Sequence, residues 1–482
     1  MGDLKQKTVS GIIWAALQKF GTMGLAFVSN IILARLLTPA DYGSIGLLTI
    51  FLVISEVFIN GGFATALIQK KSPTEDDFST VFYWNIIIAI LLYGVLYLCA
   101  PAISEFYNIP ALIQLLRDLG LVLILNALGA IQLSILRKNM QFKKLSIIQF
   151  TSVGVSVTAA IILAYSGWGI WTLVAQQLIN AAMNTILLWV TNRWIPKLRF
   201  SFVSFKELFS YGSFLLLSDL LNNICDNIQA LIIGRRYTSS DMGYYTQARK
   251  LEMVPTQSIS YVVNLVTFPV YSELQDSKEK LFMAVRKSLR CMNFVNFPLM
   301  ILLIVVAEPL IVLLFSDKWL PSVPYFRILC LIGLVNCLQS VNYQVVCAVG
   351  RSKEIFKWNI VKRIVGIGMI LTGMNWGIEG IMYGMVCSMY FTYVVNALVA
   401  KPTTGYTIQM QIKDALPLLL ICCISALASH YAGLFLHCGN FLMILIQFFI
   451  FVTIYILLSA LFKREELTEY KGIIKNMIYA HR

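Results

Sequence analysis

The sequence predicts an all-α integral membrane protein with about fourteen transmembrane helices: two six-helix lobes related by a pseudo-twofold axis along the membrane normal, plus two C-terminal helices. Three observations predict this fold class. Hydrophobic residues make up 58% of the 482 residues and charged residues only 13%, against roughly 25% charged residues in an ordinary soluble domain. Apolar segments of about 20 residues, enough to cross a bilayer, follow one another along the chain. A motif at the end of the first segment recurs 200 residues later.

The repeated motif is IILARLLTPADYG at residues 31–43, which returns as LIIGRRYTSSDMG at residues 231–243. The offset of 200 pairs Ile32 with Ile232, Arg35 with Arg235, Thr38 with Thr238, Asp41 with Asp241 and Gly43 with Gly243. Farther along, the turn GWGI at 167–170 matches NWGI at 375–378. A unit with an even number of helices repeats without inversion, so we expect an axis along the membrane normal and a working site between the lobes.

We expect the helices to be centred near residues 22, 54, 92, 124, 156, 180, 220, 255, 303, 337, 366, 388, 424 and 451. Residues 1–200 then form an N-lobe of helices one to six, and residues 201–402 form a C-lobe of helices seven to twelve. Residues 403–462 hold helices thirteen and fourteen, and residues 463–482 form a cytoplasmic amphipathic tail. The first apolar run is too long for the hydrophobic region of a signal peptide, so we expect an uncleaved first span.

The basic residues predict the orientation in the membrane. Of the 38 Lys and Arg residues, 29 fall at the two termini and in alternate connections, whereas five flank the opposite side. Positively charged connections stay in the cytoplasm, so both termini are predicted to be cytoplasmic. One such connection contains Lys278, Lys280, Arg286, Lys287 and Arg290, and another contains Arg351, Lys353, Lys357, Lys362 and Arg363. The net charge of +14 is thus explained without a nucleic-acid partner, which would require a basic face on a soluble domain.

Polar residues in the first helix of each lobe share one face. Lys19, Thr22, Ala26 and Ser29 recur at helical spacing, and the offset of 200 gives Asp219, Asn222, Asp226 and Gln229. A charged side chain near the bilayer centre costs roughly 2.5 to 3.5 kcal/mol, so the two aspartates are expected to face protein or water. The eighth helix adds a polar face of Tyr245, Arg249, Met253, Thr256 and Ser260, with Lys250 and Glu252 beside it.

Two interpretations of these inward charges stay open. They either line a solvated central cavity or form a salt-bridge cluster, for instance Lys19 with Asp219 or Asp226, and both can hold in different conformations. At the predicted outer face, Arg35 and Arg235 lie beside Asp41 and Asp241, as helix-end caps with ion pairs in the loop or as contacts of an outer gate. The ten cysteines form no CxxC motif and no metal site is expected, nor is there a Walker-type phosphate loop.

Three stretches resemble one known family: ARLLTPADYG, the run from Tyr244 to Gln275, and GWGIWTLV. They are similar to the polysaccharide transport branch of the multidrug, oligosaccharidyl-lipid and polysaccharide exporter superfamily, especially its colanic acid, teichuronic acid and O-antigen flippases. The resemblance covers essentially the whole chain. It implies a bacterial inner-membrane flippase for an undecaprenyl-diphosphate-linked oligosaccharide, which it moves to the periplasmic leaflet by alternating access for cell-surface polysaccharide or lipopolysaccharide biosynthesis. Polysaccharide polymerases and glycosyltransferases are the implied protein partners.

The resemblance also implies roles for the polar residues. Lys19, Arg249 and Lys250 fall where such flippases place cavity cations, and the predicted substrate-binding residues are these three with Asn222 and Tyr245. Asp219 and Asp226 depart from the family pattern and are candidates for carrying a coupling ion. A proton or sodium gradient is therefore the candidate energy source, and no other cofactor is expected. Independently, a diphosphate and its sugars cannot cross about 30 Å of hydrocarbon unassisted, so a wet cavity with fixed cations lowers the barrier.

Two other functions stay open. A cation-coupled small-molecule or drug exporter of the same superfamily would favour acids such as Asp219 and Asp226, but would not need Lys19 and Arg249. A membrane polysaccharide polymerase or ligase is the second alternative. Those enzymes resemble one another in a large periplasmic loop, whereas the longest outer loop predicted here has on the order of ten residues.

Overall fold

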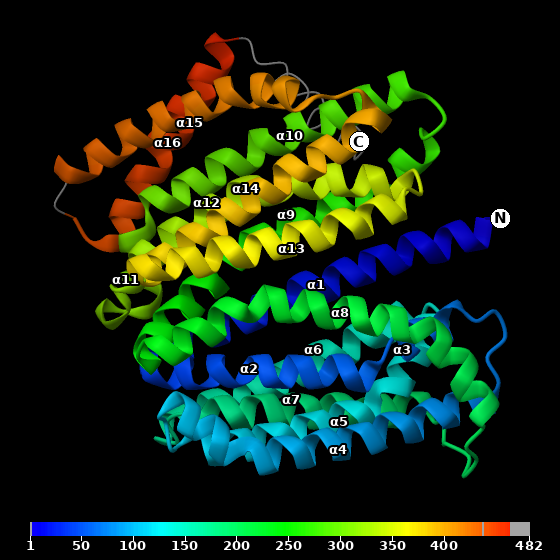
Figure 1. Cartoon of the computed structure of the whole chain (residues 1–482). Coiled ribbons are helices and arrows are strands. Elements are labelled where there is room, and N and C mark those ends of the chain that lie inside the picture. The colour runs from blue at the N-terminus through cyan, green and yellow to red at the C-terminus, as the bar shows by residue number, and fades with distance from the viewer. Residues whose placement is uncertain (1, 436–437, 463–482) are drawn as a thin grey trace. The chain divides into compact units, whose positions relative to one another are not determined.

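The computed structural model describes residues 2–435 and 438–462, and these residues form helices joined by short connections, with no strand among them (Figure 1). The all-α prediction is confirmed. In chain order the helices are α1 (Gly2–Leu36), α2 (Pro39–Asn60), α3 (Phe63–Gln69), α4 (Glu75–Tyr107), α5 (Leu112–Lys138), α6 (Phe142–Tyr165), α7 (Trp171–Asn192), α8 (Phe202–Arg236), α9 (Ser239–Glu273), α10 (Lys278–Val305), α11 (Ala307–Phe315), α12 (Ser322–Ala348), α13 (Ser352–Gly373), α14 (Gly377–Thr404), α15 (Ile408–Phe435) and α16 (Asn440–Leu461). The predicted amphipathic tail at 463–482 lies outside the described residues.

Eleven segments of the described chain are long and apolar enough to cross a membrane. One of them, Glu354–Thr404, contains both α13 and α14, and another, Pro39–Gln69, contains α2 and α3. The long helices α8 and α9 are not among these segments, because polar residues interrupt them. The chain is thus a multi-span membrane protein, and the count of fourteen spans stays a prediction.

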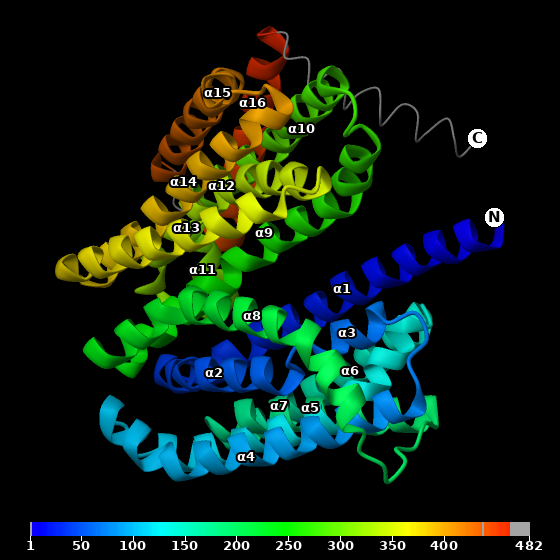
Figure 2. The ribbon, with the colours of Figure 1, turned by 45° about the vertical axis from the view of Figure 1, so that its right-hand side comes forward.

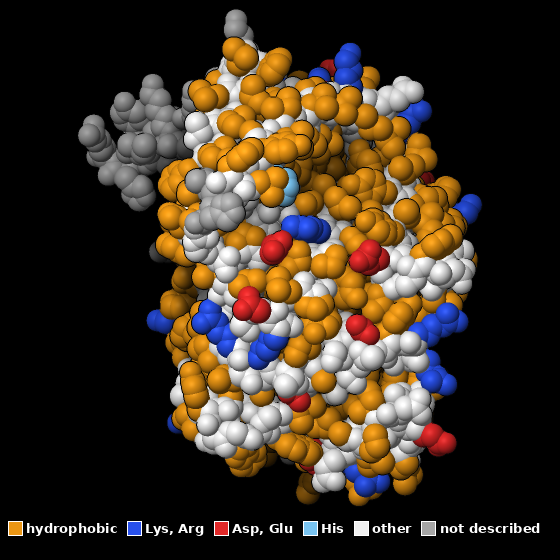
Figure 3. Space-filling model, turned by 90° about the vertical axis from the view of Figure 1, so that its left-hand side faces the viewer, with side chains coloured by type: hydrophobic (Ala, Val, Ile, Leu, Met, Phe, Trp, Pro, Cys, Tyr) orange, Lys and Arg blue, Asp and Glu red, His pale blue; other side chains and the backbone are white. Residues whose placement is uncertain are grey.

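Large apolar side chains lie on the surface of the helices, as a membrane-embedded protein requires. Leu98 of α4 is 78% exposed, and Phe449 and Leu457 of α16 are 63% and 62% exposed. In the face drawn in Figure 3, hydrophobic side chains cover much of the surface, with charged side chains scattered among them. In water such exposure would be costly, so these side chains are expected to contact lipid.

The contacts divide the chain into two compact units, Met1–Thr246 and Gln247–Arg482. In the first unit α4 packs along α5, α5 along α7, α6 along α7 and α1 along α6 (Figures 1 and 2). In the second unit α10 packs along α12, α12 along α14 and α13 along α14. The pairings of α4 with α5, α5 with α7 and α6 with α7 thus recur as α10 with α12, α12 with α14 and α13 with α14, which agrees with the sequence repeat. The predicted lobe boundaries at residues 200 and 402 stay predictions.

The repeat is most regular at the first helix of each half, because α1 ends at Leu36 and α8 ends at Arg236. The next helix begins in the same way in both copies. The Asp41 carboxylate accepts hydrogen bonds from the backbone N–H and the hydroxyl of Thr38, at 2.9 and 2.7 Å. Asp241 binds Thr238 in the same way, at 3.1 and 2.7 Å. A threonine followed by an acid three residues later is a capping box, and it satisfies backbone N–H groups that have no partner within the helix.

Helix α8 packs in the first unit, against α2, α3 and α4. The Lys70 ammonium lies 3.0 Å from both the Asp77 and the Glu207 carboxylates, which ties the start of α8 to α4. Partial burial lowers the pKa of Lys70, but its hydrogen bonds to these two acids outweigh this and raise the pKa above its usual value. Phe63 of α3 packs on Phe205 of α8, with ring centroids 5.8 Å apart.

One prediction about the connections is wrong. The basic residues between Lys278 and Arg290 were expected in a loop, yet they form the first half of α10. The predicted centre of the ninth span at residue 303 is therefore too late, because the charged first turns masked the start of the helix. The Arg286 guanidinium binds the Asp414 carboxylate of α15 in a bidentate pair, at 2.7 and 2.9 Å. The Tyr406 hydroxyl also donates to Asp414, at 2.7 Å.

We expect Asp414→Ala to lower the free energy of unfolding by about 1 to 2 kcal/mol, because it leaves the Arg286 guanidinium partly buried without its partner. The matched control is Lys280→Ala, which changes an exposed charge near the start of α10 and should have almost no effect. Thermal unfolding of the two purified variants in the same detergent checks this. Equal melting temperatures would show that the Arg286 to Asp414 pair does not hold α10 on α15.

Candidate functional site

The predicted polar stripe of α1 has two environments. Lys19 and Thr22 are partly buried, and the Thr22 hydroxyl donates to the Gln18 carbonyl of its own helix at 2.7 Å. Ser29 is only 1% exposed and accepts a hydrogen bond from Gln176 of α7 at 2.9 Å. Residues seven and ten positions apart do not lie exactly above one another on a helix. Ser29 is therefore rotated around the axis relative to Lys19 and packs inside the first unit.

The corresponding stripe of α8 is open. Asp219 and Asp226 are exposed, Asn222 is partly buried, and Gln229 is 5% exposed. Leu217 and Leu221, 55% and 48% exposed, lie on the side of the helix opposite Asp219. Exposure of carboxylates to lipid is costly, whereas exposure of leucine is not. Helix α8 thus has an apolar face suited to lipid and a polar face suited to an aqueous space.

The predicted polar face of α9 contains both accessible and buried side chains. Lys250 is exposed and Arg249 is partly buried, with its Nη1 3.8 Å from the Glu252 Oε2 atom. Tyr245 is only 4% exposed, so it belongs to packed structure more than to an open surface. Thr256 is also buried, and its hydroxyl donates a hydrogen bond to the Glu252 carboxylate at 2.6 Å. Arg249 and Lys250 are the residues of this face that are accessible to a ligand.

Two further acids lie among packed helices: Glu252, beside the polar face of α9, is buried, and Glu56 is partly buried. Glu252 is 1% exposed and lies against Gly333 of α12. Glu56 of α2 accepts a hydrogen bond from Asn126 of α5 at 2.7 Å, inside the first unit. Its partner lies 70 residues away in sequence, which is why the face of Glu56 could not be assigned from the sequence alone.

Asp41 and Asp241 cap helices, as described above, while their neighbouring arginines are exposed. The Arg235 guanidinium lies over the Phe106 ring, 5.0 Å from its centroid. A cation over an aromatic face is a modest stabilising contact. The capping role of the aspartates is thus visible in the contacts, and a role of Arg35 and Arg235 in an outer gate stays a prediction.

The two copies of the motif contact each other through glycine. A Cβ atom at Gly43 would overlap the carbonyl oxygen of Ser239, and one at Gly243 would overlap the carbonyl oxygen of Pro39. Gly46 likewise lies against the Thr246 side chain. The starts of α2 and α9 therefore cross with backbone against backbone, which only glycine allows. The sequence pairs these glycines by number, but it does not show that they touch.

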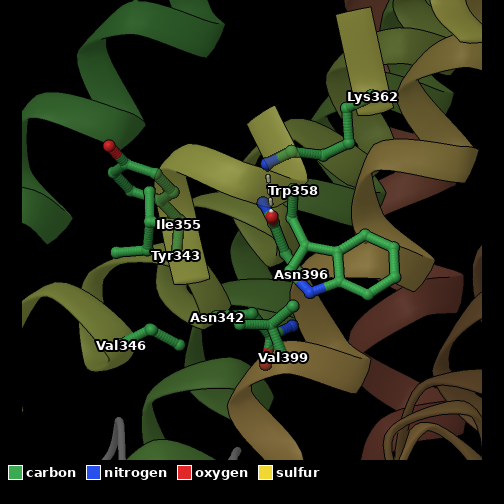
Figure 4. A pocket seen from close by; sticks show the side chains of 8 residues that line it. All are labelled: Asn342, Tyr343, Val346, Ile355, Trp358, Lys362, Asn396 and Val399. Carbon is green, nitrogen blue, oxygen red and sulfur yellow. Dashed lines mark hydrogen bonds between the residues drawn. The ribbon is translucent and has the colours of Figure 1, made fainter. Parts of the chain in front are cut away.

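A pocket in the second unit contains a cation that the sequence analysis placed in a cytoplasmic connection. That placement of Lys362 is wrong: it lies within α13 and is only 8% exposed. Its ammonium donates a hydrogen bond to the Asn396 carbonyl oxygen of α14 at 2.7 Å (Figure 4). A signal was present in the sequence, because Ile355, Trp358 and Lys362 recur at helical spacing and all line this pocket.

The predicted site residues are thus divided between the units. Lys19, Asp219, Asn222, Asp226 and Tyr245 lie in the first unit, and Arg249 and Lys250 begin the second. Their assembly into one cavity stays a prediction. Across residues 2–435 and 438–462, no three His, Cys, Asp or Glu side chains group in a way that could hold a metal ion.

Comparison with known proteins places the chain in a family. The family described as polysaccharide biosynthesis protein matches residues 32–324. The lipopolysaccharide biosynthesis protein WzxC of Escherichia coli K12 is 25% identical over 407 residues, which cover 84% of this chain and 83% of WzxC. The succinoglycan biosynthesis transport protein ExoT of Rhizobium meliloti is 27% identical over 416 residues, covering 86% of this chain and 82% of ExoT.

The fold is also that of solved transport proteins. The lipid II flippase MurJ in an inward closed conformation superposes with a TM-score of 0.78 at 17% identity, covering 95% of this chain and all of the MurJ chain. These relatives confirm the resemblance to the polysaccharide transport branch. ExoT is named a transport protein and MurJ a flippase, which agrees with the prediction of a transporter as opposed to an enzyme such as a polymerase or ligase.

Proposed function

Because the chain belongs to the polysaccharide biosynthesis protein family, we propose that it is a flippase for a lipid-linked oligosaccharide. The substrate is an undecaprenyl-diphosphate-linked oligosaccharide, moved from the cytoplasmic to the periplasmic leaflet of a bacterial inner membrane by alternating access. Both termini lie in the cytoplasm, as the distribution of basic residues indicates.

The observation that supports this proposal most is that α8 is amphipathic. Asp219 and Asp226 are exposed on one side of a helix whose opposite side exposes Leu217 and Leu221. In a membrane, such a helix separates lipid from water. A sugar head group with many hydroxyls needs a wet path, whereas its polyprenyl chain needs the lipid alongside.

The cations of the predicted site are suited to a diphosphate. Arg249 can bind phosphate oxygens in a fork and Lys250 can act as a point charge, and both side chains are at least partly accessible. Lys19 of α1 is the third cation of the proposed site. The Arg249 Nη1 atom lies 3.8 Å from the Glu252 carboxylate, longer than a hydrogen bond, so the guanidinium can still bind a phosphate.

The proposal is tested in the bacterium that makes the glycan. Deleting the gene should cause the lipid-linked oligosaccharide to accumulate with its sugars inaccessible from outside the cell, and re-expression should restore surface glycan. The complementary control is a deletion of the first glycosyltransferase, which should abolish the lipid-linked intermediate altogether. Normal surface glycan in the gene deletion would contradict the proposal.

One observation favours a second candidate, a cation-coupled exporter of small molecules. Asp219 and Asp226 are exposed on α8, and exposed acids in a water-filled path can bind a proton or a sodium ion. We propose that they carry the coupling ion in either case. The two candidates differ in cargo, since an exporter of small molecules would leave the surface glycan unchanged when deleted.

We expect the double variant Asp219→Asn and Asp226→Asn to make transport insensitive to the ion gradient, because an amide does not bind a proton or balance a sodium ion. Transport is measured with the proton or the sodium gradient collapsed in turn. The control is Glu279→Gln, an exposed acid at the start of α10, which should behave as wild type. Wild-type transport that survives both collapses would refute a coupling role.

A further inference from the structure

The Lys362 pocket lies inside the second unit, between α12, α13 and α14. Tyr343, Val346 and Ile355 lie on one side, and Trp358 lies on the other, with Lys362 pointing toward Asn396 between them (Figure 4). Asn342 and Val399 complete the lining. The pocket is partly open, and the unfilled space among its lining residues and at its mouth, open surroundings included, is about 210 Å³.

Lys362 carries a charge that the described protein does not neutralise. Its ammonium makes one hydrogen bond, to Asn396, and lies 5.8 Å from the centroid of the Tyr343 ring. Among the described residues, no Asp or Glu oxygen lies within 4.0 Å of it. Glu354, an acid in the first turn of α13, already binds Arg351, with Oε1 3.0 Å from the arginine Nε. A buried cation without a counter-ion is costly, so an anion in the pocket would stabilise it.

The two asparagines of the pocket form hydrogen bonds with other residues of the second unit, which hold them in place. The Asn396 amide donates to the Gln339 side-chain oxygen at 2.9 Å, which fixes its own carbonyl oxygen toward Lys362. Asn342 and Gln411 of α15 exchange hydrogen bonds at 3.0 and 3.1 Å. The amides are therefore positioned by neighbours, and Lys362 retains ammonium hydrogens for a ligand, because an ammonium has three donors.

The residues that line the pocket favour some kinds of anion over others. Val346, Ile355 and Val399 are apolar, and Tyr343 and Trp358, 36% and 38% exposed, are the aromatic types that lie at lipid head groups. A hydrated free ion gains little from apolar walls. One ammonium matches the single charge of a phosphodiester, whereas a diphosphate bearing several sugars would exceed both the charge and the space.

We propose that the Lys362 pocket binds the phosphodiester head group of an anionic bilayer phospholipid. The phosphate accepts hydrogen bonds from the Lys362 ammonium, and the glycerol and upper acyl carbons contact the apolar and aromatic wall. The residues that line this pocket are not those proposed for the flippase path, and the proposal does not depend on the flipping activity.

The test uses the full-length protein in detergent with added phosphatidylglycerol or phosphatidylcholine, and native mass spectrometry measures the lipid retained. Wild type should retain phosphatidylglycerol about tenfold better than Lys362→Met does, the effect of losing one charged hydrogen bond. The matched control is Lys357→Met, which removes an exposed cation of the same helix and should retain the lipid as wild type does.

Several results would overturn the proposal. They are equal retention by wild type and Lys362→Met, equal retention of the two lipids by wild type, or displacement of phosphatidylglycerol by millimolar inorganic phosphate, which would indicate a site for a free anion. If Lys362→Met does not fold, as judged by its melting temperature, Val399→Phe serves instead. It fills the pocket while keeping the lysine, and undiminished retention by this variant would equally contradict a lipid in the pocket.

Discussion

Gly43→Ala and Gly243→Ala are each expected to reduce transport by more than tenfold while the protein remains in the membrane. In the structure, the starts of α2 and α9 meet through these glycines, and a methyl group would overlap the backbone of the opposite motif. The overlap costs about 1 to 3 kcal/mol in any conformation where the two starts touch, and nothing where they separate. The variants should therefore shift the population toward conformations in which this end is open, by about ten- to a hundredfold.

The shift is measured with a cysteine at Ser240, in a background without the native cysteines, labelled by a membrane-impermeant maleimide. Labelling should be faster in both glycine variants than in the parent. Gly94→Ala in α4 and Gly154→Ala in α6 are matched controls, because a Cβ at either position meets nothing within 4 Å. Wild-type transport and labelling in Gly43→Ala would mean that the crossing of α2 and α9 does not move during the cycle.

Lys19→Ala and Arg249→Ala are each expected to abolish glycan export at normal protein levels. The two cations belong to the proposed diphosphate site, and removing one leaves the phosphate charge poorly compensated in a medium where charge is costly. Surface glycan and the amount of protein are measured in the same cells. Lys71→Ala, an exposed cation just after α3, is the control and should export normally. Wild-type glycan in both variants would remove these residues from the site.

Much of the fold could be predicted from the sequence, because membrane spans appear in it as recurring apolar segments and the two halves as a repeat. The offset of 200 predicted α1 and α8, whose ends differ by that number, and Thr38 with Asp41 predicted the helix start that the structure shows. The start of α10 was missed because Arg286 and its neighbours resemble a cytoplasmic loop in composition. Its partner, Asp414, is 128 residues away, and no local pattern reveals such a pairing.

The candidate site was predictable only in part, for the same reason. Helical spacing placed Asp219 and Asp226 on one face of a helix, since a shared face depends on that helix alone, and the structure shows both side chains exposed. The burial of Ser29 against Gln176 and of Lys362 against Asn396 depends on neighbouring helices. Lys362 shows most clearly what the sequence could not reveal. Because it lies near other basic residues, the positive-inside rule assigns it to a cytoplasmic connection, whereas the structure buries it.

The most direct test of the account is reconstitution of the purified protein into vesicles that contain the undecaprenyl-diphosphate-linked oligosaccharide of the host. The sugars in the outer leaflet are oxidised or bound by a membrane-impermeant reagent, and the remaining fraction is followed over time. The account predicts that wild-type protein makes nearly all of the lipid accessible, whereas the Lys19→Ala protein leaves about half protected, the share of the inner leaflet. Protection of half of the lipid in vesicles that contain folded wild-type protein would contradict a flippase.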